Sequence, residues 1–84
     1  MKEEIITEMT RCIENWGNGG DNSAKVRGVK ICDSETFLCG YGNGYSMEEL
    51  LDCESAEELA EGWYNACNST SAETLEEQIE RLSK

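Results

Sequence analysis

Apolar residues in the first sixteen positions recur at steps of three and four residues. The series consists of Ile5, Ile6, Met9, Cys12, Ile13 and Trp16. Such spacing places the apolar side chains along one stripe of an α-helix. The sequence therefore predicts a helix over about residues 2–15. The next stretch, "WGNGGDNS" (16–23), holds three glycines and two asparagines, which are turn formers that end the helix.

A different pattern begins at residue 24. In "AKVRGVKIC" (24–32), charged residues are interleaved with valine and isoleucine, as is typical of a strand with one buried face. The tripeptide "DSE" then forms a turn before "TFLCGY", which is rich in strand-forming residues. We therefore expect antiparallel strands over about 24–32 and 36–42. Arg27-Gly28 interrupts the alternation, so we place a β-bulge there.

The segment after the second strand permits two interpretations. Asn43-Gly44 is the strongest short-range signal for a type I′ hairpin turn, and it favours a third strand over 45–51. Ser46 and Glu49, however, match a capping box and would begin a short helix instead. We favour the strand, because three strands present a wider face for helices to cover.

Two helices close the chain. Ser55 with Glu58 is a capping box that opens a helix over about 55–67, and Thr70 with Glu73 opens another over about 71–83. The expected fold is a single α+β domain, residues 1–84, in which a helix, a small sheet and two helices follow in order. Its predicted core consists of Ile5, Met9, Ile13, Trp16, Val29, Ile31, Phe37, Leu51, Leu59, Trp63, Leu75, Ile79 and Leu82.

The five cysteines do not suggest a metal or disulfide framework. Their number is odd, none forms a C-x-x-C pair, and the chain has no histidine to complete a mixed zinc site. Cys12 and Cys67 fall on apolar stripes, where a thiol behaves as a small hydrophobe. We expect buried free thiols and no cofactor. A disulfide between Cys32 and Cys39, or a metal site, are the less favoured alternatives.

Composition excludes several classes of function. Eighteen acidic and seven basic residues give a net charge of −11, which opposes direct binding to nucleic acid or to anionic membranes. No apolar run is long enough to span a bilayer, and the start "MKEEIITEM" lacks the apolar core of a signal peptide. We therefore expect a cytoplasmic protein.

Catalytic chemistry finds little support in the residue types present. Histidine, the commonest general base, is absent, and a cysteine nucleophile would need a positive surrounding that this chain does not offer. The glycines of "GYGNGYS" are followed by Glu48 and Glu49, which would repel a phosphate. The sequence therefore favours a protein that is not an enzyme.

The acidic residues are concentrated in the second half. Residues 1–45 carry seven acids and five bases, whereas residues 46–84 carry eleven acids and two bases. No lysine or arginine lies between Met47 and Glu80. Two sets repeat the same spacing and are expected to line one side of each closing helix. The candidate partner-binding residues are Glu48, Glu49, Asp52, Glu54, Glu57, Glu58, Glu61, Glu73, Glu76, Glu77 and Glu80.

This charge density resembles that of a nucleic-acid backbone. Four carboxylates over eight helical residues give one charge per about 3 Å of helix axis. One strand of B-DNA carries a charge per about 3.4 Å. The pattern favours a nucleic-acid mimic that blocks the basic groove of a DNA- or RNA-binding protein. Three alternatives stay open: a soluble acidic surface without a partner, a dimer through the last helix, and an interaction module anchored by aromatic residues (Trp63, Tyr64, Tyr41 and Tyr45).

The order of elements, together with "CESAEELAEGWYNACNSTSAETLEEQIE" (53–80), resembles the small acidic phage-encoded anti-CRISPR proteins. Some members of that group occupy the site on a CRISPR effector nuclease where the protospacer-adjacent duplex would bind. The resemblance implies a stoichiometric inhibitor without catalytic activity. It also implies that the acids of residues 48–61, and to a lesser extent those of 73–80, contact a basic nucleic-acid-binding partner.

Overall fold

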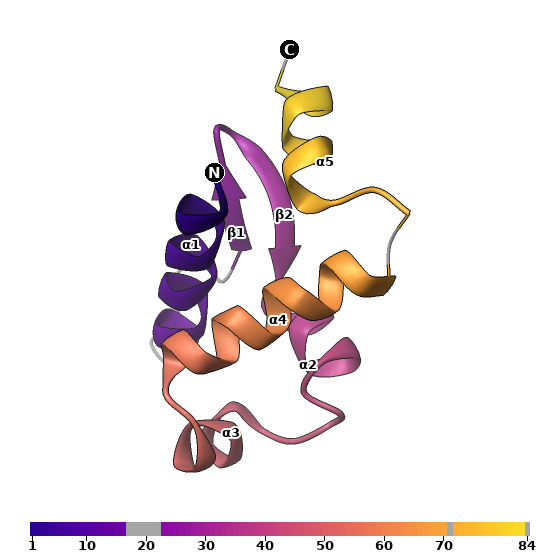
Figure 1. The fold of residues 1–84 in the computed structure, drawn as a ribbon. Coiled ribbons are helices and arrows are strands. Elements are labelled where there is room, and N and C mark those ends of the chain that lie inside the picture. Colours follow the sequence, from indigo (N-terminus) through magenta and orange to yellow (C-terminus); the bar gives the residue numbers. More distant parts are fainter. Residues whose placement is uncertain (17–22, 71, 84) are drawn as a thin grey trace.

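The computed structural model describes residues 1–16, 23–70 and 72–83, in which a helix, a β-hairpin and four further helices follow in order (Figure 1). The elements are α1 (Lys2–Asn15), β1 (Ser23–Val26), β2 (Val29–Asp33), α2 (Ser34–Gly40), α3 (Met47–Cys53), α4 (Ala56–Thr70) and α5 (Leu75–Leu82). The predicted α+β class and the first helix are therefore confirmed. The turn expected at 16–23 lies mostly outside the described residues.

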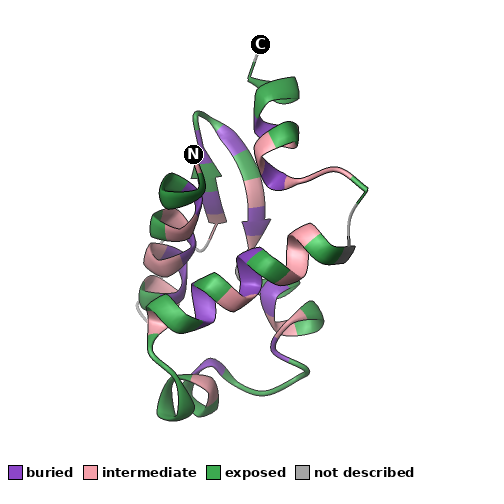
Figure 2. Ribbon diagram, viewed as in Figure 1, coloured by how far each residue is buried: buried purple, intermediate pink, exposed green. Residues whose placement is uncertain are grey.

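The helices cover the hairpin from several sides. In Figure 1, α1 runs alongside β1, α5 stands beside β2, and α4 crosses in front of the lower end of α1. α3 lies at the end of the molecule opposite to both chain ends. Buried residues on α1, α4 and the hairpin face one common core (Figure 2), in which the rings of Phe37 and Trp63 are 4.7 Å apart between centroids.

The hairpin is shorter than predicted, and its two strands and turn together occupy the stretch expected to form the first strand alone. Arg27 and Gly28 form its two-residue turn, with φ of 55° and 80°. Positive φ at both positions is the mark of a type I′ turn, whose twist matches that of the flanking strands. The bulge predicted at Arg27-Gly28 is therefore wrong, and the irregularity lies between Ala24 and Lys25. The paired residues are Ser23 and Asp33, Ala24 and Cys32, Lys25 and Lys30, and Val26 and Val29.

The strand predicted over 36–42 is wrong, because α2 occupies most of that stretch. Asp33 caps this helix: its Oδ1 accepts hydrogen bonds from the backbone N–H and the hydroxyl of Thr36, each at 2.8 Å. These bonds, with a further one from Lys30, lower the pKa of Asp33 to about 2. An N-terminal cap satisfies backbone donors that a helix would otherwise leave unpaired. Here it outweighs the strand preference of Thr36 and Phe37.

The third strand favoured over 45–51 is also wrong, and the alternative short helix is confirmed. Ser46 and Glu49 form the capping box that begins α3. Asn43 and Gly44 do adopt positive φ, 53° and 84°, and the N–H of Tyr45 donates to the Gly42 carbonyl at 3.0 Å. The turn signal was therefore correct in its local geometry, but this turn connects two helices.

The two closing helices are confirmed, with one cap misplaced. Ser55 and Glu58 form the predicted capping box at the start of α4. The cap predicted at Thr70 and Glu73 is wrong, because the helix begins later and Thr74 accepts the hydrogen bond from the N–H of Glu77.

Most of the predicted core is buried, with two exceptions. The side chains of Leu51 and Leu82 are 42% and 50% exposed, so their assignment to the core is wrong. Trp16 and Ile31 are half-buried and pack against its edge. The prediction omitted seven further members of the core, namely Cys12, Ala24, Val26, Cys32, Met47, Ala60 and Tyr64.

Candidate partner-binding surface

Seven carboxylates of the second half gather on α3, on the start of α4 and on the link between these helices. We call this set the α3–α4 acidic surface, and every member is exposed. No lysine or arginine interrupts the sequence from the first to the last of them. The members are Glu48, Glu49, Asp52, Glu54, Glu57, Glu58 and Glu61.

The packing of α4 determines which way its carboxylates point. Leu59, Ala60 and Trp63 are buried and turn one side of the helix toward the core. Glu57 and Glu61, four residues apart, therefore share the outer side, where neighbouring side chains are separated by about 5–6 Å. The capping serines of α3 and α4 orient two further members. The carboxylate of Glu49 accepts a hydrogen bond from the Ser46 hydroxyl, and that of Glu58 accepts one from the Ser55 hydroxyl.

A groove between α1 and α4 extends the acidic surface. Glu57 and Glu61 line it from α4, and Glu8 and Glu14 line it from α1, around a volume of about 460 Å³. Arg11 also lines this groove, where it pairs with Glu8 at 3.1 Å and donates to the Ser23 carbonyl at 2.8 Å. Sequence reasoning missed Glu14. Its position off the apolar stripe of the first helix marks it as exposed, but only the crossing of α1 and α4 brings it into the same groove as Glu57.

The four acids around α5 are in a different situation, and we call them the α5 acidic set. Glu73 accepts two hydrogen bonds from the Arg81 guanidinium, at 2.8 and 2.9 Å, and these hold the pKa of Glu73 below its usual value. Glu76 accepts a hydrogen bond from the Tyr64 hydroxyl, and Glu77 one from Thr74. Only Glu80, the fourth member, lies exposed with none of these bonds.

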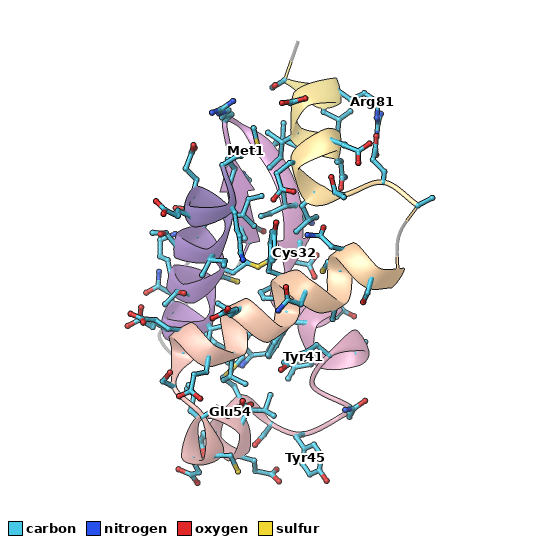
Figure 3. The ribbon with its side chains drawn as sticks, in the orientation of Figure 1. Met1, Cys32, Tyr41, Tyr45, Glu54 and Arg81 are labelled. Carbon is cyan, nitrogen blue, oxygen red and sulfur yellow. The ribbon has the colours of Figure 1, made fainter. Side chains whose placement is uncertain are left out.

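The two acidic groups lie at opposite ends of the molecule. In Figure 3, Glu54 is at the lower end beside α3, and Arg81 is at the upper end beside α5. The molecule is 38 Å along its longest axis. The structure therefore does not join all eleven predicted residues into one continuous surface.

A close approach between α2 and α4 supports the inner side of the acidic surface. The Tyr41 ring lies against Gly62, where an added Cβ would collide with the hydroxyl oxygen. Glycine permits this contact because it has no side chain. Burial, and to a lesser degree the charge of Glu54, raise the pKa of Tyr41. Tyr41 thus holds α2 onto α4 near the acids.

The aromatic residues considered as anchors are mostly inside the protein. Trp63 and Tyr64 are 2% and 7% exposed and belong to the core. Tyr41 is half-buried, and Tyr45 is 56% exposed at the α3 end (Figure 3). Tyr45 is therefore the one of these four residues that is well exposed.

The thiols differ in environment. Cys32 and Cys39 carry free thiols, the first buried on β2 and the second exposed on α2. Burial raises the pKa of Cys32 far above its ordinary value, which keeps the thiol protonated. In the ranges that the structure describes, no three cysteine, aspartate or glutamate side chains are arranged to hold a metal ion.

Comparisons with known proteins found no family model, no curated protein and no solved structure that matches this chain. Across residues 1–16, 23–70 and 72–83, none of the helices combines the length and the apolar character needed to cross a membrane.

Proposed function

We propose that this is a non-catalytic, cytoplasmic inhibitor that mimics nucleic acid. Its α3–α4 acidic surface would occupy the basic groove in which a partner protein binds DNA or RNA. The observation that carries the proposal is the exposure of seven carboxylates over residues 48–61 with no basic residue among them.

Electrostatics supports a role for this surface beyond solubility. Like charges four residues apart on a helix destabilise it by a few tenths of a kcal/mol per pair, and mixed signs would keep the protein equally soluble. Glu57 and Glu61 form such a pair, and the groove adds Glu8 and Glu14 against the single charge of Arg11. A concentrated negative potential steers a basic partner toward it and accelerates association.

The α5 acidic set has a smaller part in the proposal. Arg81 and Tyr64 already engage Glu73 and Glu76, so these two carboxylates present less charge to a partner. The resemblance of residues 53–80 to anti-CRISPR proteins makes a CRISPR effector nuclease one candidate partner, with contacts at the α3–α4 acidic surface.

A second candidate is an interaction module that uses an aromatic anchor, since such residues dominate many interfaces. Exposed Tyr45 is the observation that favours it. Salt separates the two candidates. Contacts made by exposed charges weaken as salt rises, whereas burial of an aromatic ring depends little on salt.

The test is affinity capture on the immobilised protein at low salt, followed by elution in a salt gradient. We expect basic nucleic-acid-binding proteins that elute at moderate salt and that duplex DNA displaces. Replacing Glu57 and Glu61 by glutamine should lower the affinity of a captured partner about tenfold at low salt.

A matched control makes the same change of charge elsewhere. The Glu3→Gln/Glu35→Gln protein also gains two units of charge, at exposed positions on α1 and α2. Its affinity should stay within about twofold of the wild type, because these positions lie off the proposed surface. Binding that is insensitive to salt and to duplex DNA would contradict mimicry.

A further inference from the structure

A second groove, largely apolar, lies between the end of α1 and the short helix α3. Ile13 and Met47 are buried at its base, and half-buried Trp16 and exposed Leu51 stand along it. Glu14 and Glu48 also line it, around a volume of about 440 Å³. We call it the Trp16–Leu51 groove.

Apolar side chains remain exposed in this groove because other elements cover little of α3. This seven-residue helix buries only Met47, and Figure 2 shows most of its surface as exposed. Leu51 keeps 42% of its exposure on the same helix. Removing such exposed apolar area from water against a partner is favourable.

The charges around the groove indicate what would fill it. Glu14 and Glu48 are its charged lining residues, and among the described residues no lysine or arginine lines it. The α3–α4 acidic surface continues from Glu48 through Glu49 and Asp52. An apolar side chain would be attracted to the base, and positive residues on either side of it would meet the carboxylates.

We propose that the Trp16–Leu51 groove receives an apolar side chain of the partner, carried on a basic segment beside the partner's nucleic-acid-binding groove. This inference rests on the proposed function, and it explains how the protein would select one basic partner among many. An acidic surface alone attracts basic proteins in general, whereas a buried apolar contact near the centre of an interface gives specificity and slows dissociation.

The experiment uses two helical peptides of equal positive charge. The first has lysines on one face of the helix and leucines on the opposite face. The second is the same peptide with every leucine replaced by glutamine. We expect the lysine–leucine peptide to bind about tenfold more tightly and to shift the indole N–H resonance of Trp16. The lysine–glutamine peptide should bind weakly and leave this resonance nearly unchanged.

Two leucine variants locate the contact. Leu51→Gln should remove the preference for the lysine–leucine peptide, whereas Leu82→Gln should retain it. Leu82 is a matched control, because it is 50% exposed and lies on α5, away from the groove. Equal affinities of the wild type for the two peptides, or equal effects of the two substitutions, would overturn the proposal.

The same titrations separate this inference from mimicry. A tenfold leucine preference that persists while both peptides bind without salt dependence would remove mimicry and retain the groove. Strong salt dependence without a preference for the lysine–leucine peptide would retain mimicry and overturn the role of the groove. The comparison of peptides on the wild-type protein needs no variant, so it stands even if Leu51→Gln unfolds.

Discussion

The two acidic groups have the same spacing in the sequence and different surroundings in the structure. Both contain four glutamates at steps of three, one and three residues, the first over 54–61 and the second over 73–80. In both, a hydroxyl residue follows the first glutamate and caps the helix, with Ser55 for α4 and Thr74 for α5. The spacing of the acids and the position of the cap are therefore equivalent, but Arg81 follows Glu80 where Gly62 follows Glu61.

Their neighbours make them different. Arg81 pairs with the first glutamate of the α5 acidic set, and Tyr64 from α4 donates to the second. The Lys2 ammonium lies 5.5 Å from the centre of the Tyr64 ring, so a second cation is close to this end of the molecule. Among the first four glutamates, Glu58 instead exchanges hydrogen bonds with Ser55, the cap of its own helix. The spacing of hydroxyl and glutamate thus determines the cap, whereas Arg81 on α5 and Tyr64 on α4 determine which carboxylates of the second set are already bonded.

The largest expected effect comes from the contact that engages Glu76. Tyr64→Phe should lower the free energy of unfolding by about 1.5 kcal/mol, because it removes a hydrogen bond to a carboxylate from a buried ring. Tyr45→Phe, at an exposed ring, should leave the stability unchanged within error. Urea denaturation of both variants measures the difference. Equal stabilities would mean that the α5 acidic set is not held as described.

Alkaline pH provides an independent measurement of the same contact. The bond to Glu76 and burial raise the pKa of Tyr64 above its ordinary value of 10.0. Ionisation is therefore easier in the unfolded chain, so this contribution to stability is complete below pH 10 and is lost as pH rises toward the folded pKa. The wild type should lose more stability above pH 10 than Tyr64→Phe does. Parallel pH profiles would contradict this assignment.

The two caps should respond alike, with an intermediate effect. Ser55→Ala and Thr74→Ala should each cost about 1 kcal/mol, because each leaves a helix N-terminus with an unpaired backbone donor. Thr74→Ser keeps the hydroxyl and should cost much less. Thermal and urea denaturation would show the two alanine variants as equal. Markedly different losses of stability in Ser55→Ala and Thr74→Ala would show that residues packed around the helix termini also affect the caps.

The smallest effect concerns repulsion within the α3–α4 acidic surface. Glu61→Gln should stabilise the protein by a few tenths of a kcal/mol at low salt, because it relieves the like-charge pair with Glu57 on α4 and lies beyond the first turn of that helix. The gain should shrink as salt screens the charges. Glu76→Gln should not stabilise, because its carboxylate is bonded to Tyr64. Stability at two salt concentrations measures this, and a loss for Glu61→Gln would indicate an unrecognised contact.

Sequence pattern was most informative where the relevant interactions are local. Apolar periodicity located α1, α4 and α5 within a few residues, and the capping box at Ser55 was found from four consecutive positions. The same local chemistry misled us at Thr36 and Phe37, where strand preference was weighed but the cap from Asp33 was not. It also placed the turn of the first hairpin at residues 33–35, although the hairpin closes at Arg27-Gly28 and Asp33 caps α2.

The sequence by itself determined the α+β class, the helices with strong periodicity and the concentration of acids after residue 46. Only the tertiary structure decided that Leu51 stays exposed beside Trp16, that Glu14 joins Glu57 in one groove, and that Tyr64 engages Glu76. The physical reason is range. Capping and periodicity act between residues a few positions apart, whereas burial and charge pairing depend on whichever distant segment packs alongside.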